Sequence, residues 1–203
     1  MIKPGGLYKF DPAIVGFELD RQFHALKHFT VLNSSAFKGF IEQGYSKEEI
    51  ESRLRTVGSK FSPEFAESPA EILEVLKKSK FIVINEVETK REVPGRLSIE
   101  IDEKAYPNGI GKDALIPLSD IPENQNIYKK PVKGFMLNFI SGELRSTNIL
   151  NIIFNKFSES PVIHTIFPGE YAPPIPVYEK QPEMEYKKNL SFWEKHALIE
   201  EDL

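Results

Sequence analysis

The sequence predicts an α+β fold: N-terminal helices, then a largely antiparallel sheet of about six strands, a Pro-rich strap and a short C-terminal helix. Before residue 80, apolar residues recur at helical spacing behind helix-capping signals, and from residue 80 onward their period changes to two. Five prolines between 168 and 182 then indicate an extended segment. We therefore expect a helical part (1–79), a sheet core (80–167) and a strap with a docked helix (168–203), packed as one unit.

The N-terminal part carries four helix signals in chain order. Asp11-Pro12 begins an apolar face that continues to Phe29, and Ser35 is placed to cap a second helix that ends at Gly44. Ser46–Glu49 and Ser68–Glu71 both have the spacing of a capping box, in which the side chains at the two ends bond each other's backbone N–H. A layer of helices is therefore predicted.

The middle part contains runs of β-branched and aromatic residues separated by turn residues. Leu97–Ile101 alternates, which predicts one wet face, whereas 134–140 and 162–167 are apolar on both faces and are expected to be central strands. The six predicted strands are Phe81–Val87, Leu97–Ile101, Ala114–Leu118, Gly134–Ile140, Ile149–Phe154 and Val162–Phe167.

The C-terminal part is expected to run extended over residues 168–189 because of its prolines. Ser191–Glu194 has the spacing of a third capping box, which predicts a short last helix held down by Trp193.

Composition excludes several functional classes. The 203 residues include no cysteine, which removes disulfides, thiolate metal sites and a cysteine nucleophile. No apolar run is long enough to span a membrane and the start lacks a signal-peptide pattern, so we expect a cytoplasmic chain. The net charge of −4 argues against broad binding to nucleic acid. Residues 126–178 are nevertheless net +2, which fits either a solvated surface or one local phosphate site.

His24 and His28 are separated by one helical turn, so both imidazoles are expected on one helix face. Such a pair is compatible with metal binding if a third ligand joins it, with acid–base chemistry, or with two ordinary surface histidines. We expect no metal, because the Glu of a metalloprotease motif is replaced by Ala25.

Asn108–Asp113, with glycines at 109 and 111, superficially resembles a phosphate loop. It lacks the spacing of a Walker loop and the third glycine of a dinucleotide loop, so a glycine-permitted turn is the simpler interpretation. No cofactor is predicted.

His164 lies in an apolar strand that ends abruptly at Pro168-Gly169. Strict alternation would place His164 and Thr165 on opposite faces. The histidine is then either a buried structural residue or part of a site, where an imidazole can act as a general acid or base near neutral pH.

The stretch from Gly134 to Pro168 resembles the C-terminal core of the barnase–EndoU–colicin–RelE group of ribonuclease toxins. The matching features are the strand 135–140, the Ser141-Gly142 hairpin, the strand 149–154 and Ile163-His-Thr-Ile-Phe-Pro168. The resemblance implies His164 and Thr165 on the last strand as catalytic residues, with Arg145 and the helix histidines His24 and His28 as further matches.

The resemblance also implies a reaction, cleavage of RNA without a metal by attack of a 2′-hydroxyl on phosphate. His164 would act as base or acid, Thr165 would donate a hydrogen bond, and Arg145 would hold the phosphorane charge. Substrate binding is predicted for four further residues, namely Tyr171, Lys129, Lys130 and Lys133.

Two other functions stay open on the sequence. The chain could be a non-enzymatic interaction or immunity-type protein with an acidic binding surface, and the Pro-rich segment Tyr171–Tyr178 could dock in a partner's aromatic groove or close the chain's own sheet. It could also bind a small molecule with His164 in an apolar pocket. The nuclease hypothesis requires His164 or Thr165 to reach solvent within ~7 Å of Arg145 or a helix histidine.

Overall fold

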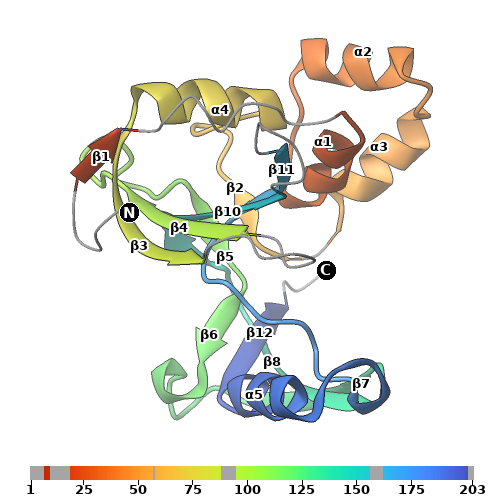
Figure 1. The fold of residues 1–203 in the computed structure, drawn as a ribbon, viewed down its shortest axis with the longest axis vertical. Coiled ribbons are helices and arrows are strands. Elements are labelled where there is room, and N and C mark those ends of the chain that lie inside the picture. Colours follow the sequence, from red (N-terminus) through yellow and green to blue (C-terminus); the bar gives the residue numbers. More distant parts are fainter. Residues whose placement is uncertain (1–6, 10–18, 57, 88–94, 156–161, 201–203) are drawn as a thin grey trace.

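The chain has an α+β fold in a computed structural model that describes residues 7–9, 19–56, 58–87, 95–155 and 162–200 (Figure 1). This confirms the predicted class. The helices are α1 (Leu19–Ala25), α2 (Ser34–Glu42), α3 (Lys47–Leu54), α4 (Pro69–Lys78) and α5 (Glu183–Trp193), with short 3₁₀ turns η1 (Leu26–His28), η2 (Leu118–Asp120) and η3 (Tyr178–Lys180).

The strands form three mostly antiparallel sheets rather than one. The five-stranded sheet has the order β1-β3-β4-β10-β11, the four-stranded sheet β6-β12-β8-β7 and the three-stranded sheet β2-β5-β9. Their bounds are β1 Leu7–Lys9, β2 Lys60–Phe61, β3 Lys80–Val87, β4 Gly95–Ile101, β5 Gly111–Asp113, β6 Leu115–Pro117, β7 Ile127–Val132, β8 Phe135–Ser141, β9 Arg145–Thr147, β10 Ile149–Asn155, β11 Val162–Pro168 and β12 His196–Glu200. All six predicted strands are present.

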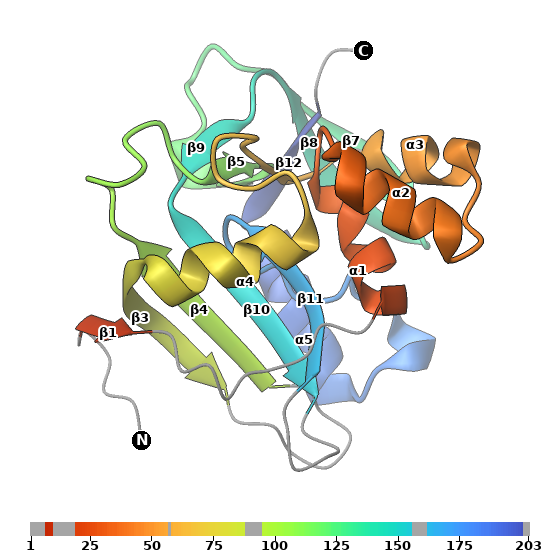
Figure 2. The ribbon, with the colours of Figure 1, turned by 90° about the horizontal axis from the view of Figure 1, so that it is seen from above.

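The main core lies between the five-stranded sheet and α4. Alternate residues of β4 and β10, among them Leu97, Ile99 and Ile152, are buried against Ile72 and Leu76 of the helix. Figure 2 shows α4 lying across this face and α1 beside β11 at the end of the sheet. The opposite face of the sheet turns toward the four-stranded sheet, which lies below it in Figure 1.

The four-stranded sheet is covered on both faces. Leu115 and Leu137 pack with Trp193 of α5 on one face, and Ile116, Ile140 and Ile199 are buried on the other. The three-stranded sheet joins the two larger ones, because β5 runs almost directly into β6.

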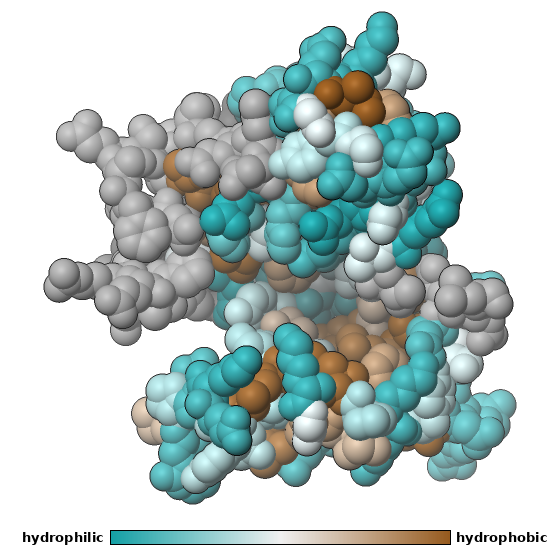
Figure 3. All heavy atoms as spheres, turned by 90° about the vertical axis from the view of Figure 1, so that its right-hand side faces the viewer, coloured by the Kyte–Doolittle hydropathy of each residue, from teal (hydrophilic) through white to brown (hydrophobic). Residues whose placement is uncertain are grey.

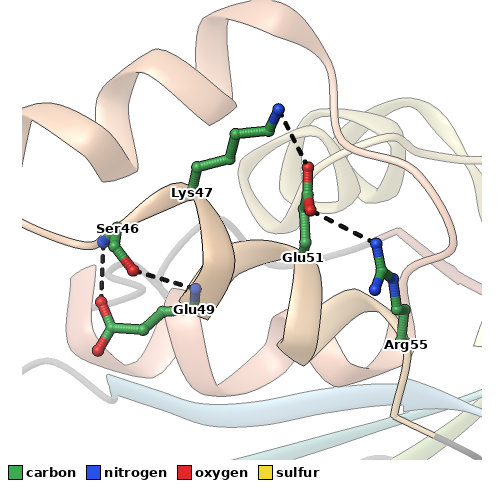
Figure 4. A network of polar contacts seen from close by, with 5 residues as sticks. All are labelled: Ser46, Lys47, Glu49, Glu51 and Arg55. Carbon is green, nitrogen blue, oxygen red and sulfur yellow. Dashed lines mark hydrogen bonds and ion pairs between the residues drawn. The ribbon is translucent and has the colours of Figure 1, made fainter.

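The N-terminal helices begin where capping chemistry places them, with two corrections. Ser68 caps α4 by accepting from the Glu71 N–H at 3.3 Å, but the Glu71 carboxylate accepts from the Glu67 N–H and not from that of Ser68, so this predicted box is only half formed. The capping box of Ser46 and Glu49 is present, and the same helix carries Glu51 between Lys47 and Arg55 (Figure 4). Helix α2 is capped by Asn33, whose side chain accepts from the Ala36 N–H at 2.8 Å, and not by Ser35. Asn33 lies one residue outside the helix, where an Asx side chain reaches the third N–H. The predicted start at Asp11-Pro12 falls outside the described residues.

Three predictions about the second half of the chain are wrong. The order of the described strands puts β11 at the end of its sheet, and its second apolar face exists because α1 and η1 pack against it. The predicted helix at Ser191 is instead the last turn of α5, which begins at Glu183, so residues 183–189 are helical where an extended segment was predicted. The residues after it form β12, whose apolar residues alternate and pair parallel with β8.

Candidate functional site

A pair of histidine side chains joins the helical part to the sheet. The imidazole centroids of His24, on α1, and His164, on β11, lie 6.5 Å apart, and both side chains are half-buried. This distance is within the limit that the sequence hypothesis required. The two residues are 140 positions apart in the chain, and the packing of α1 against β11 brings them together.

A β-bulge re-aims His164. Ile153 of β10 is opposite Thr165, while the next residue, Phe154, is opposite Ile163, so His164 is the extra residue on β11. Ile163 and Ile166 are both completely buried in the main core, which leaves His164 and Thr165 together on the side away from the core. The predicted strict alternation is therefore wrong here, because a bulge inserts one residue into the period of two.

Arg96 and Tyr171 lie on the same side of the sheet. Arg96 is opposite Ile153 of β10, which is opposite Thr165 of β11, and residues opposite one another in antiparallel strands share a face. The guanidinium carbon of Arg96 lies 3.9 Å from the centroid of the Tyr171 ring. In the described part of the chain, the buried Nε of Arg96 and the buried Oγ1 of Thr165 have no hydrogen-bond partner.

The sequence did not point to Arg96. It lies one residue before the predicted strand Leu97–Ile101, and the register that places it opposite Thr165 depends on pairings between strands far apart in the chain. The predicted wet face of β4 is also partly closed. Ser98 is buried, and its hydroxyl lies 2.6 Å from Oδ1 of the fully buried Asn151.

Cations surround His24 and keep it neutral. Burial lowers its pKa from 6.5 to about 4, and Lys27 and Arg53 add to the effect through their positive charge. The Lys27 Nζ lies 3.2 Å from the His24 Nε2. Burial and the charge of Arg53 likewise lower the pKa of Lys27. His24 is therefore an unprotonated imidazole at neutral pH in a positive local field.

His28 has a structural environment. Its Nδ1 lies 3.0 Å from the Ser59 carbonyl oxygen, and its ring lies 5.5 Å from that of Phe167. Burial lowers its pKa to about 3 despite that hydrogen bond. It therefore supports the contact between η1 and β11. The contacts of His28 described here are with Ser59 and Phe167, and its catalytic role stays a prediction.

Arg145 and the three lysines lie elsewhere. Arg145 is on β9 and forms an ion pair with Asp120 at 3.8 Å. Lys129 and Lys130 are on β7, at the far end of the four-stranded sheet, and Lys130 binds Glu200 at 2.5 Å. Lys133 occupies the turn between β7 and β8 with a φ of 51°. In the described chain, Arg145 is thus paired with a residue of η2 and Lys130 with a residue of β12, and neither ion pair involves the five-stranded sheet that carries His164.

The Pro-rich segment packs mainly on its own chain. Ala172 and Ile175 join the cluster around Trp193, whose indole N–H donates to the Pro173 carbonyl at 3.1 Å. Tyr178 at the end of the segment is exposed. Tyr171 at its start contacts the guanidinium of Arg96 and lies near the ring of Phe167, with ring centroids 6.4 Å apart.

Asp113, which the sequence did not single out, is the most connected buried carboxylate described here. Its oxygens accept hydrogen bonds from the Ser59 hydroxyl and from the N–H groups of Leu115 and Glu170 at 2.8–3.2 Å. Burial raises its pKa in spite of these bonds. Gly169 faces this carboxylate at a φ of 94°, and a side chain there would overlap it. The interpretation of the neighbouring Gly109 as a turn residue is confirmed by its φ of 86°.

Among the described residues, no group of three or more His, Asp or Glu side chains is placed to hold a metal ion. None of the helices described has the length and apolar character needed to cross a membrane.

Comparisons of the chain with protein-family models, with curated proteins and with solved structures find no match. The site therefore has to be interpreted from its own geometry.

Proposed function

We propose that the chain is a metal-independent endoribonuclease-like enzyme that cleaves RNA by attack of a ribose 2′-hydroxyl on the adjacent phosphate. The observation that carries this proposal is the His24–His164 pair, with ring centroids 6.5 Å apart. Two imidazoles at this separation can reach opposite sides of one phosphate group, as transfer of one proton in and one proton out requires.

Each imidazole has a role in this reaction. His24, neutral because its pKa is lowered to about 4, accepts the proton of the 2′-hydroxyl. The 2′-oxygen then forms a bond to phosphorus, and the bond from phosphorus to the 5′-oxygen breaks. His164 donates a proton to that 5′-oxygen, so the products are a cyclic phosphate and a 5′-hydroxyl. Thr165, on the same side of the bulge, donates a hydrogen bond to a phosphate oxygen.

The local charge supports an anionic substrate. Lys27, Arg53 and Arg21 are all close enough to His24 to lower its pKa, although the whole chain has a net charge of −4. A cluster of cations around a half-buried site attracts phosphate even when the remaining surface is acidic.

The test is cleavage of single-stranded RNA and tRNA in excess chelator, with products identified by mass. We expect cyclic-phosphate ends from the unmodified chain and a loss of about 100-fold or more in rate for both His24→Ala and His164→Ala. His196→Gln is the matched control, because that ring stacks on Phe192 at 3.9 Å in another part of the fold. Absence of cleavage by the folded, unmodified chain would contradict the proposal.

A second candidate function is protein binding through an acidic surface, without catalysis. A hollow of about 420 Å³ beside β3 and β4 is lined by apolar residues that include Ile82, and by three acidic residues and one basic one, namely Glu100, Asp102, Glu103 and Lys104. Such a site fits a basic side chain of a partner protein. A chain that leaves RNA intact in the test above would favour this function.

A further inference from the structure

We propose that Arg96, whose guanidinium lies over the ring of Tyr171, is the phosphate-binding residue of the site, and that its ligand is a phosphodiester of single-stranded RNA. This inference rests on the proposed function. It gives Arg96 the phosphate-binding role that the sequence analysis assigned to Arg145.

The first argument is the uncompensated charge of Arg96. The side chain is half-buried, and its Nε is buried without an acceptor. No ion pair to Arg96 is present in the described ranges, whereas Arg55 and Arg145 both have carboxylate partners. Because an arginine side chain stays charged and loses hydration here, an anionic ligand is the natural counterion.

The second argument is the orientation of the guanidinium. A carbon-to-centroid distance of 3.9 Å means that the guanidinium lies against the face of Tyr171. Stacking occupies the face of the group and leaves the N–H donors along its edge for hydrogen bonds. A planar fork of donors fixed in this way matches two oxygens of a phosphate.

The third argument is position. Arg96, Ile153 and Thr165 form one row across β4, β10 and β11, so the backbones of Arg96 and Thr165 are about 10 Å apart, two strand spacings. The hydroxyl of Thr165 and the imidazole of His164 are on the same side of the sheet. A phosphate held between Arg96 and Thr165 therefore lies beside the His24–His164 pair.

One side of the molecule is hollowed. Figure 3 shows the molecule hollowed between its upper part, which contains the N-terminal helices, and its lower part, which contains the four-stranded sheet and α5. The non-core face of the five-stranded sheet turns toward this lower part (Figure 1).

The test separates binding from cleavage by using a 2′-O-methyl RNA oligonucleotide, which cannot undergo attack by a 2′-hydroxyl. We expect Arg96→Gln to weaken its binding about tenfold, and Tyr171→Leu to weaken it in the same direction. Tyr171→Phe, which keeps the ring beneath the guanidinium, should recover the binding lost in Tyr171→Leu. Arg55→Gln is the charge-matched control and should retain full affinity, because Arg55 is exposed and pairs with Glu51 on α3 (Figure 4). Circular dichroism of every variant checks that it is folded.

A second arm uses an oligonucleotide with a neutral methylphosphonate backbone. If Arg96 binds phosphate, Arg96→Gln changes its affinity little. Equal affinities of Arg96→Gln and Arg55→Gln for the charged oligonucleotide, or an undiminished effect of Arg96→Gln on the neutral one, would overturn the inference. Tight, Arg96-dependent binding by a chain that leaves ordinary RNA intact would support this inference and overturn the proposed cleavage.

Discussion

At the scale of single residues, His164 shows how one local irregularity changes which side chains share a face of the sheet. Strict alternation would separate its side chain from that of Thr165, and the bulge places them on the same side. A bulge depends on how two strands pair and leaves no reliable mark in one strand's sequence. The residue types of the site were therefore predictable, whereas their grouping, and the choice of Arg96 over Arg145, were not.

His28 provides a residue-scale prediction about stability. Its pKa is about 3 in the fold and 6.5 when exposed, so the folded protein holds the neutral form while the unfolded chain takes up a proton between these values. Its contribution is complete above pH 6.5 and decreases as the pH falls toward 3. We expect a loss of about 1 kcal/mol of unfolding free energy per pH unit from this residue.

The measurement is urea unfolding between pH 7 and pH 4.5, with His28→Asn as the variant. Asparagine retains an N–H donor for the Ser59 carbonyl and removes the titration. The pH dependence of the variant should be shallower. If both proteins have the same slope, His28 is not the buried neutral histidine described here.

At the scale of elements, strong hydrophobic periodicity and helix-capping signals predicted the helices and strands correctly. Strands that are very short, or whose composition is typical of a loop or a helix, were not predicted. The six β-branched runs are strands, and the Ser46 box caps α3. Strands β5 and β9 have three residues each, which is too short to show a period. Strand β7, Ile-Tyr-Lys-Lys-Pro-Val, has a composition typical of an exposed basic loop. Strand β12 was missed because Ser191–Glu194 was interpreted as the start of a helix that would include the residues of β12. An S-x-x-E pattern also occurs by chance within a helix, and here it lies at the end of α5.

The position of β12 between β6 and β8 makes an element-scale prediction. Ile199 is buried in the second core, and truncation of a buried isoleucine leaves a cavity. We expect Ile199→Ala to lower the unfolding free energy by about 2–5 kcal/mol. Met184→Ala on α5 is the control, since that side chain is 85% exposed. Equal stability of the two variants in thermal unfolding would mean that β12 does not complete the sheet.

At the scale of the whole molecule, Asp113 links parts that lie far apart in the chain. It joins Ser59 before β2, Leu115 on β6 and Glu170 at the start of the Pro-rich segment. These three contacts connect the five-stranded sheet, the three-stranded sheet and the path to α5. We therefore expect this carboxylate to help hold the two larger sheets in their relative position.

Asp113→Asn tests that role. An amide can replace one carboxylate oxygen, and its NH₂ group would then face a donor, so one N–H loses its acceptor. We expect a loss of about 1–3 kcal/mol in unfolding free energy and faster amide exchange at Glu170. Asp120→Asn is the matched control, with a side chain 51% exposed, and should change stability by less than about 0.5 kcal/mol. Unchanged exchange at Glu170 in Asp113→Asn would count against the proposed link.

Charge at this scale also accounts for the contrast between the acidic chain and its site. The net charge is −4, yet the groups that face His24 are Lys27, Arg53 and Arg21. The composition alone argued against nucleic acid, because it averages over the surface. The folded arrangement concentrates positive charge at the imidazole pair.

The most direct test of the central claim is cleavage, in excess chelator, of a DNA oligonucleotide that contains one ribonucleotide. The account predicts a single cut, on the 3′ side of that nucleotide, with a cyclic phosphate on the product. It also predicts that the His24→Ala/His164→Ala double variant cleaves no more slowly than the slower single variant, because the two groups act as a unit. An intact oligonucleotide after incubation with the unmodified chain, or cleavage by the double variant at the unmodified rate, would contradict it.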